Sequence, residues 1–169
     1  MQVVKQIIVV LIVLPLAVML FMPKKELYYL LEKKLYTQQI MISGERVQEG
    51  PLSLTIAHPV FSLAGASLAR AEHITLWSLL FYTKADVKGV VVAEGLPAEV
   101  SIQTLTATHT LLSPMKITLS GESSIGALQG YVDLGTRTLH LDIAKAEKNK
   151  AVSKYLKKGQ KGWYYESKF

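Results

Sequence analysis

The stretch Gly126–Ala144, GALQGYVDLGTRTLHLDIA, decides the fold class of this chain. Apolar and polar residues alternate on both sides of DLGTRT, and that central segment has the Gly and polar residues of a hairpin turn. The turn joins Leu128, Val132 and Leu134 to Leu139, Leu141 and Ile143. Strands connected by a short turn pair antiparallel. The stretch therefore predicts an antiparallel β-hairpin.

The same period of two begins at Gln38 and fills the middle of the chain. QIMIS, LSLTIA and EVSIQTLTATHTLL alternate, and Thr104, Thr106, Thr108 and Thr110 form a ladder typical of a sheet face that is not fully buried. SLARAEHITLW reads as one strand, partly exposed or bulged at Arg70 and Glu72, whereas WSLLFYT (77–83) fits either a strand or a short helix. With turn signals every 8–12 residues, residues 38–144 are predicted to form about eight or nine antiparallel strands in a twisted sheet or incomplete β-barrel.

The N-terminus is strongly apolar. Ile7–Met22 holds 16 residues without a charge, and only Lys5 interrupts the run from Val3 to Pro23. A membrane-spanning helix needs about 20 apolar residues. A cleaved secretory signal would end in small residues, whereas here Leu20, Phe21 and Met22 precede Pro23. Residues 1–23 are therefore predicted to be an uncleaved transmembrane signal-anchor.

Charges next to this anchor leave its orientation open. Lysines at 24, 25, 33 and 34 outnumber Lys5, and by the positive-inside rule they favour a cytoplasmic domain. Long domains translocate largely regardless of such charges. Because an N-terminal signal-anchor normally keeps its short tail inside, we expect an inner-membrane, single-pass protein with its C-terminal domain in the periplasm.

Residues 24–37 have the spacing of an amphipathic juxtamembrane helix. Its apolar stripe consists of Leu27, Leu30, Leu31 and Leu35, and its polar face consists of Lys24, Lys25, Glu32, Lys33 and Lys34. Two interpretations are compatible with each other. The lysines lie on lipid headgroups while the leucines meet a partner, or the leucines pack on the chain's own sheet.

The C-terminal segment 145–169 is basic and then aromatic. Seven of the 19 basic residues lie between Lys145 and Lys161, and the net charge of the chain is +6. AEKNKAVSKYLKK is predicted to be a short basic helix, and GWYYESKF a final strand or latch. The residues expected to meet a membrane or partner are Lys154, Lys157, Lys158, Trp163 and Tyr164. A solvated helix face explains the charges equally well, and nucleic acid is not an expected partner.

Motifs that carry chemistry are missing from the sequence. The chain has no cysteine, and His58, His73, His109 and His140 form no metal-ligand pair at a diagnostic spacing. No serine lies in G-x-S-x-G, and no phosphate-binding glycine loop occurs. We therefore expect a protein that is not an enzyme and that has no catalytic residues, cofactor or metal.

The order of parts resembles a known family. PKKELYYLLEKKL directly follows the predicted anchor, ISGERV comes next, and a late G-x-L-x-G-x-V-x-L hairpin closes the strand series. This arrangement is similar to the type II secretion system protein N family (general secretion pathway protein N), which itself resembles the membrane-tethered, β-rich AsmA-like proteins. The matching positions are Pro23, Leu27, Leu30, Leu31, Gly126, Leu128, Gly130, Val132, Leu134, Arg137, Leu139 and Leu141. The resemblance implies a non-enzymatic inner-membrane accessory of protein secretion.

Two functions follow as expectations. The first is a component of a type II secretion or related pilus-like apparatus, acting through protein–protein contacts of the β domain. The second is a membrane-tethered lipid-binding or lipid-transfer module of the lipopolysaccharide-export or AsmA-like type. A lipid module needs a continuous apolar groove, which an interaction domain would fill with its own side chains. Alternation alone does not distinguish the two, although the threonine ladder argues against a groove on its own face.

Overall fold

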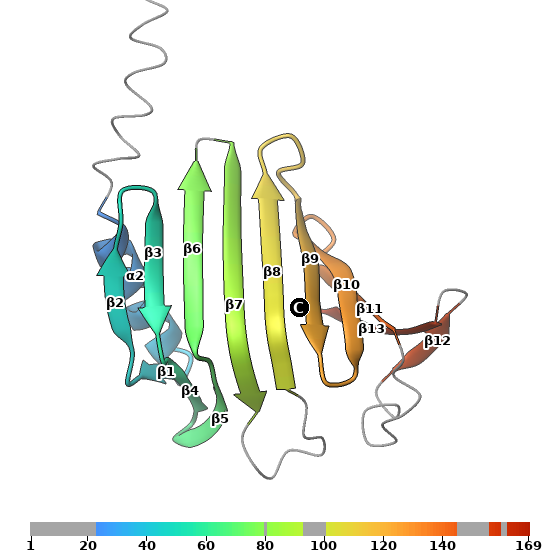
Figure 1. Cartoon of the computed structure of the whole chain (residues 1–169), viewed down its shortest axis with the longest axis horizontal. Coiled ribbons are helices and arrows are strands. Elements are labelled where there is room, and N and C mark those ends of the chain that lie inside the picture. The colour runs from blue at the N-terminus through green and yellow to red at the C-terminus, as the bar shows by residue number, and fades with distance from the viewer. Residues whose placement is uncertain (1–22, 80, 93–100, 145–155, 160–161) are drawn as a thin grey trace, which may run out of the picture.

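The computed structural model describes residues 23–79, 81–92, 101–144, 156–159 and 162–169. These residues form one helix and an open antiparallel sheet (Figure 1). The elements are α2 (Lys24–Tyr36), β1 (Ile40–Ser43), β2 (Arg46–Glu49), β3 (Ser53–Ala57), β4 (Val60–Leu63), β5 (Ala66–Arg70), β6 (His73–Leu79), β7 (Tyr82–Val92), β8 (Ser101–Thr110), β9 (Lys116–Ser123), β10 (Gly126–Asp133), β11 (Thr138–Ile143), β12 (Lys157–Gly159) and β13 (Gly162–Lys168). The predicted antiparallel, mainly β class is confirmed.

Most neighbours in the sheet are also neighbours along the chain. The main path runs β1-β4-β5-β7-β8-β9-β10-β11-β13-β12, and β6, β3 and β2 continue from the first half of β7. Strand β7 therefore divides its pairing between β6, over Tyr82–Lys88, and β5, at Val91 and Val92. The hairpin predicted from Gly126–Ala144 is β10–β11, with Leu128 opposite Ile143 and Val132 opposite Leu139.

The sheet has one apolar and one polar face, and its registers fix which is which. Paired residues on adjacent strands share a face. One row across eight strands reads Leu54, Leu76, Ala85, Ala107, Leu119, Gly130, Leu141 and Tyr165. The next row, on the opposite face, reads Thr55, Thr75, Asp86, Thr106, Ser120, Gln129, Asp142 and Tyr164. The threonine ladder thus lies on the polar face, and the apolar face is the one with Leu105 and Ala107.

Two glycines let neighbouring strands approach closely where the sheet bends. A Cβ at Gly121 would overlap the backbone carbonyl of Thr104, and one at Gly130 would overlap that of His140. In both places only a hydrogen in place of the side chain leaves room for the adjacent strand. Glycine at these positions therefore permits the strong curvature from β8 to β11 (Figure 1).

Helix α2 begins after Pro23, whose carbonyl accepts a hydrogen bond from the Leu27 amide at 3.2 Å. The helix ends at Tyr36, where the Thr37 hydroxyl donates to the Lys34 carbonyl at 2.6 Å. The chain then reverses through Gln39, whose φ is 63°. This reversal brings β1 back along the helix, and α2 contacts both β1 and β2.

Buried apolar residues gather at the two ends of the apolar face. Tyr28, Leu54 and Ile56 form one cluster under α2, with Ile42, Val47, Ile74 and Leu76 packed against it. Leu128 and Ile143 form the other cluster, with Ile102, Ile125, Leu156 and Trp163 around it. Between the clusters, Ala85, Ala107 and Leu119 are only half-buried. The apolar face is therefore covered at its ends and partly open in its middle.

The structure corrects two local predictions and decides between the alternatives of a third. Within 38–144 the described residues hold eleven strands, β1 to β11, rather than eight or nine, because turns break the expected strands into shorter ones. SLARAEHITLW is β5 and β6, separated at Ala71 and Glu72, since the Ala71 and Glu72 amides donate to Pro59 and Lys88 rather than to a continuous ladder. Of the two alternatives for WSLLFYT, the strand is confirmed, since the segment holds the end of β6 and the start of β7.

Both termini contain predictions that reach beyond the described residues. Positions 1–22 of the predicted anchor lie outside them, and no helix within the described ranges is long and apolar enough to cross a membrane. Residues 146–155 of the predicted basic helix also lie outside. Lys157 and Lys158 are in strand β12 rather than in a helix, because this short strand pairs with Trp163 and Tyr164 of β13. The final strand predicted from GWYYESKF is β13.

Candidate functional site

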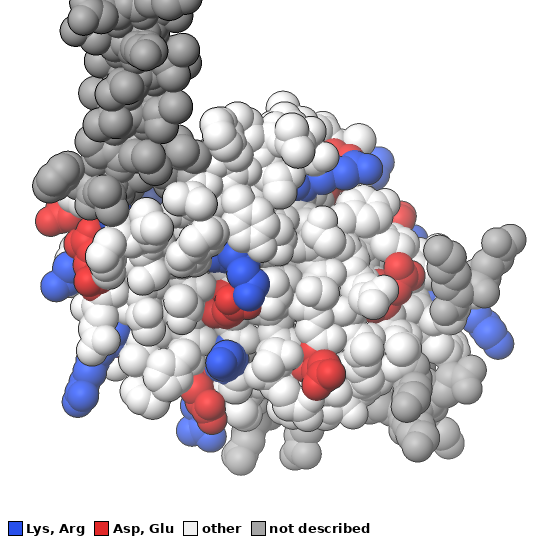
Figure 2. All heavy atoms as spheres, turned by 45° about the horizontal axis from the view of Figure 1, so that its top comes forward, with Lys and Arg blue, Asp and Glu red and all other residues white. Residues whose placement is uncertain are grey.

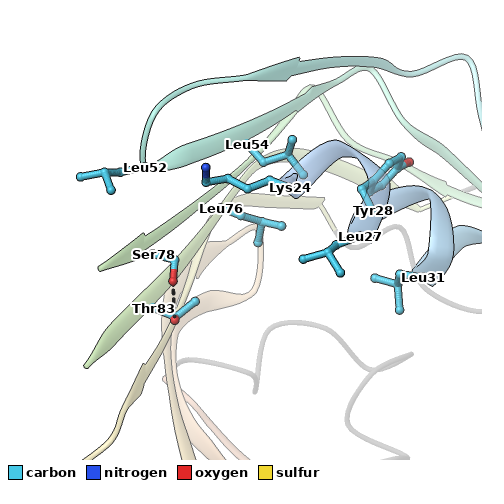
Figure 3. Close-up of a pocket in the computed structure, with 9 residues that line it drawn as sticks. All are labelled: Lys24, Leu27, Tyr28, Leu31, Leu52, Leu54, Leu76, Ser78 and Thr83. Atoms are coloured by element: carbon cyan, nitrogen blue, oxygen red, sulfur yellow. Dashed lines mark hydrogen bonds between the residues drawn. The ribbon is translucent and has the colours of Figure 1, made fainter. Parts of the chain in front are cut away.

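The candidate site is an apolar trough between α2 and one end of the apolar sheet face (Figure 3). Its cavity volume is about 280 Å³. The lining residues come from the helix, the β2–β3 turn and strands β3, β6 and β7, and they are Lys24, Leu27, Tyr28, Leu31, Leu52, Leu54, Leu76, Ser78 and Thr83. Leucine side chains supply most of the wall, and a hydroxyl pair, Ser78 and Thr83 at 3.3 Å, lies at one side. Ligand pockets usually measure roughly 300–1,000 Å³, so the trough is large enough for part of a ligand.

Tyr28 fixes the helix on the sheet and so forms one wall of the trough. It is 5% exposed and packs with Leu54 and Ile56. Its hydroxyl donates to Glu45 Oε1 at 3.3 Å. Burial, followed by the carboxylates of Glu45 and Glu32, raises the pKa of Tyr28 far above its ordinary value. The phenol therefore remains neutral and keeps its role as a donor across the physiological range.

Of the two interpretations of the leucine stripe, full packing on the chain's own sheet does not agree with the structure. Leu27, Leu30 and Leu31 are exposed, Leu30 by 62%, and Leu35 is half-buried. Tyr28 takes the inward position because the sheet contacts an arc of the helix next to the stripe. Leu27 and Leu31 instead line the trough, and Leu30 faces away from the core.

The predicted lysine face of the helix is also divided. Lys24 turns inward, with its backbone amide 3.0 Å and its Nζ 3.8 Å from Glu49 Oε1. Lys25 is half-buried, whereas Lys33 and Lys34 are exposed. The inward position of Lys24 explains why it lines the trough although the sequence pattern placed it opposite the leucines.

The C-terminal residues predicted to contact a membrane or partner lie in different environments. Lys154 is outside the described residues. Lys157 and Lys158 are exposed on β12, and Lys157 Nζ lies 3.9 Å from Glu166 Oε1. Trp163 and Tyr164 are half-buried, and Trp163 packs against the cluster of Leu128 and Ile143. The aromatic residues therefore belong to the sheet and do not form an exposed platform.

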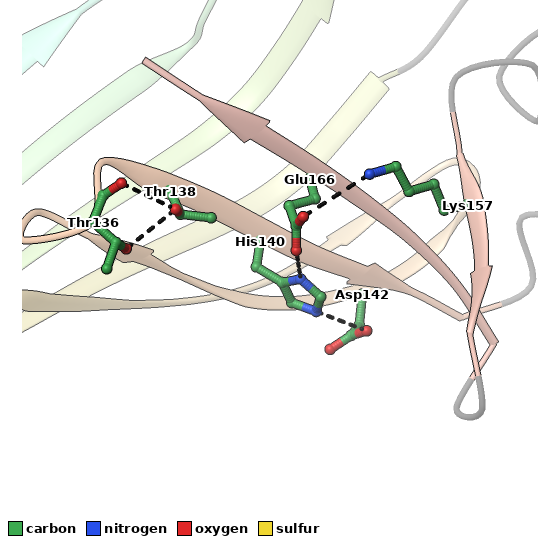
Figure 4. A network of polar contacts seen from close by, with 6 residues as sticks. All are labelled: Thr136, Thr138, His140, Asp142, Lys157 and Glu166. Carbon is green, nitrogen blue, oxygen red and sulfur yellow. Dashed lines mark hydrogen bonds and ion pairs between the residues drawn. The ribbon is translucent and has the colours of Figure 1, made fainter.

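A polar cluster on the other face holds β13 against β11 (Figure 4). His140 is stacked between Tyr131 and Tyr164, with ring centroids 5.3 and 5.2 Å away. Its Nε2 lies 3.4 Å from Asp142 Oδ1, and its Nδ1 lies 3.5 Å from Glu166 Oε2. Among the described residues this buried Nδ1 has no hydrogen-bond partner, so its approach to Glu166 is a contact without a hydrogen bond. The cluster connects strands β10, β11 and β13.

The described histidines do not assemble a metal site. His58 and His73 come together at a ring-centroid distance of 5.4 Å beside a cavity of about 520 Å³ that Arg70 and Glu72 also line. Sequence spacing gave no signal for this pair, because the β3–β4 turn and the start of β6 bring it together. Within the described ranges, no group of three or more His, Cys, Asp or Glu residues is placed to hold a metal ion.

Comparison of the chain with protein-family models, with curated proteins and with solved structures finds no match. The resemblance to the type II secretion protein N family therefore stays a hypothesis.

Proposed function

We propose that this protein is a non-enzymatic, membrane-tethered module that holds lipid acyl chains against the apolar face of its sheet. The observation that carries the proposal is the continuous apolar row from Leu54 to Tyr165, left half-buried in its middle. A protein that stabilises only itself would cover such a face, because buried apolar area stabilises by about 25 cal/mol per Å².

The trough is the point at which a chain would enter. Its wall is apolar, and Leu27 and Leu31 of the helix face it together with Leu54 and Leu76 of the sheet (Figure 3). At about 280 Å³ it accommodates a segment of an acyl chain rather than a whole lipid. The rest of the chain would extend along the half-buried row formed by Ala85, Ala107 and Leu119. The short side chains of the two alanines leave room above the sheet in the middle of this path.

The predicted anchor supports the same function. Only Pro23 separates the apolar run Ile7–Met22 from Lys24, a residue that lines the trough. A tether of this kind would keep the trough next to the bilayer from which lipids come. In this proposal the domain lies on the periplasmic side of an inner membrane.

Photocrosslinking tests lipid contact directly. The full-length chain would be reconstituted in nanodiscs that contain a phospholipid with a diazirine in its acyl chain, and labelled peptides would be mapped after irradiation. We expect label on segments 52–54 and 76–83. Thr83→Phe fills the trough and should remove most of this label, whereas Thr75→Phe adds the same bulk on the polar face and should not. Label that does not respond to Thr83→Phe would contradict the proposal.

A second function is favoured by the exposed helix side chains. Leu30 and Tyr36 are both more than 60% exposed, at 62% and 66%, and neither contributes to the trough. Exposed apolar residues on a helix are typical of docking into a groove of another protein. We propose as the alternative a secretion-apparatus component that binds its partner subunits through this helix. Leu30→Asp would then remove protein crosslinks in whole membranes and leave lipid label in nanodiscs unchanged.

A further inference from the structure

One end of the sheet carries apolar side chains where turns are usually polar. We define the apolar rim as Phe81, Leu111, Leu112, Met115 and Leu134, all of them exposed. Phe81 is 63% exposed and Leu112 is 95% exposed. Turns in water favour Gly, Pro, Asn, Asp and Ser. The segment Leu111–Met115, LLSPM, instead places three large apolar side chains in one connection.

Three connections form the rim, and registers place them at the same end. Tyr82 pairs with Thr110, which sets the β6–β7 turn beside the β8–β9 loop. Lys116 pairs with Asp133, which sets that loop beside the β10–β11 turn. The rim therefore runs across the end of six consecutive strands.

Backbone hydrogen bonds hold the three connections together. The Leu111 amide donates to the Phe81 carbonyl at 2.9 Å, and the Leu134 amide donates to the Met115 carbonyl at 2.8 Å. Within the loop, the Lys116 amide donates to the Ser113 carbonyl at 3.0 Å. The exposed side chains are thus presented by a fixed scaffold.

The rim lies at the end of the sheet where the described chain begins. The Lys24 amide is bonded to Glu49, the last residue of β2 before the β2–β3 turn. Lys24 also lines the trough together with Ser78 and Thr83, which flank the β6–β7 turn. Figure 1 shows α2 beginning at this upper end, and Figure 2 shows mostly uncharged side chains there. The apolar run Ile7–Met22 therefore joins the domain at the rim's own end.

We infer that the apolar rim is a membrane-docking surface that inserts into the headgroup region of the bilayer beside the anchor. The inference rests on the membrane tether of the proposed function and adds a second, independent point of contact. Transfer of apolar side chains from water into a membrane surface lowers the free energy and so favours binding. Lys116 and Arg137, next to the rim, are placed to meet anionic headgroups, with Asp133 as the neighbouring acidic group.

Two points of contact determine the orientation of the domain relative to the membrane. A tether alone leaves a domain free to tilt, whereas an anchor plus a rim fixes the strands upright on the membrane. The trough would then open toward the headgroups, because Ser78 and Thr83 connect it to the rim. Lipid would enter the trough without crossing water.

Single labelled cysteines test this geometry, since the natural chain has none. Leu112→Cys, Lys25→Cys and Ser124→Cys would each carry the dye NBD on the full-length chain in vesicles of phosphatidylethanolamine and phosphatidylglycerol containing a doxyl-labelled quencher lipid. Ser124 is exposed at the opposite end of β9 and is the matched control. We expect quenching at 112 and 25 and none at 124.

Charge insertion supplies the second measurement. Phe81→Asp with Met115→Asp should abolish quenching at 112, shift its emission to the red and leave the label at 25 quenched. An unquenched label at 112 together with a quenched label at 25 would overturn the rim inference. Lipid photocrosslinks in the trough depend on the proposed function and not on insertion of the rim. Failure of the rim inference is therefore distinguishable from failure of the proposed function. A label at 112 shielded in whole membranes but not in vesicles would point to a protein partner and also overturn the inference.

Discussion

Replacement of Tyr28 by Ala measures how strongly helix α2 is held on the sheet. Tyr28 is 5% exposed, so nearly its whole side chain leaves water. Aromatic side chains bury about 150–250 Å², which at about 25 cal/mol per Å² stabilises by roughly 4–6 kcal/mol. Comparable substitutions in protein cores cost about 3–5 kcal/mol. We expect Tyr28→Ala to lower the free energy of unfolding by about 3–5 kcal/mol.

The neighbouring tyrosine provides the control. Tyr29 is 47% exposed, and Tyr29→Ala should cost less than about 1 kcal/mol. Tyr28→Phe removes only the hydrogen bond to Glu45 and should cost about 0.5–1.5 kcal/mol. Urea denaturation of the full chain in a mild detergent, followed by far-UV circular dichroism, measures all three. Equal losses for Tyr28→Ala and Tyr29→Ala would refute the assignment of Tyr28 as the residue that fixes the helix.

Three further predictions concern the sheet. Gly130→Ala places a Cβ against the His140 carbonyl and should lower the free energy of unfolding by about 1–3 kcal/mol, as measured by urea denaturation. Burial raises the pKa of Asp86, but hydrogen bonds from Lys84 and Thr106 outweigh it, so the pKa is lowered overall. Asp86 therefore stabilises the fold at neutral pH, and this stabilisation is lost as pH falls below the ordinary aspartate range. The midpoint of urea denaturation would be measured at pH 7 and at pH 3 for the wild type and for Asp86→Asn. If the midpoint changes by the same amount in both proteins between the two pH values, the prediction is contradicted. Ala64 has a φ of 50°, so Ala64→Gly should raise the free energy of unfolding by about 1 kcal/mol. Ala66→Gly within β5 should lower the free energy of unfolding, and urea denaturation measures both.

The sheet could be predicted because its polar and apolar residues alternate. The threonines from Thr104 to Thr110 share the polar face, as their spacing indicated. The strand number was too low because breaks at Pro59 and Ala71 depend on backbone bonds to distant residues, which local pattern does not reveal. Local composition favours a helix at Lys157 and Lys158, yet pairing with β13 overrides that preference.

The trough could be predicted only in its parts. The apolar spacing predicts a helix over residues 24–37, and α2 spans Lys24–Tyr36. The apolar arc of the helix includes Tyr28 as well as the leucines, and periodicity does not say which part of a broad arc the sheet will contact. Residues from 24 to 83 meet in the trough through sheet pairing, so their convergence has no signal in the sequence.

The hairpin order of the central strands has a consequence for how such a chain can vary. From β6 to β11, each strand pairs with the next one along the chain. Insertion or deletion of a whole hairpin in this region changes the width of the sheet by about 10 Å and requires no rethreading of the remaining strands. The width of the apolar face can therefore change one hairpin at a time, by gene duplication or by design. The helix and both ends of the domain stay as they are.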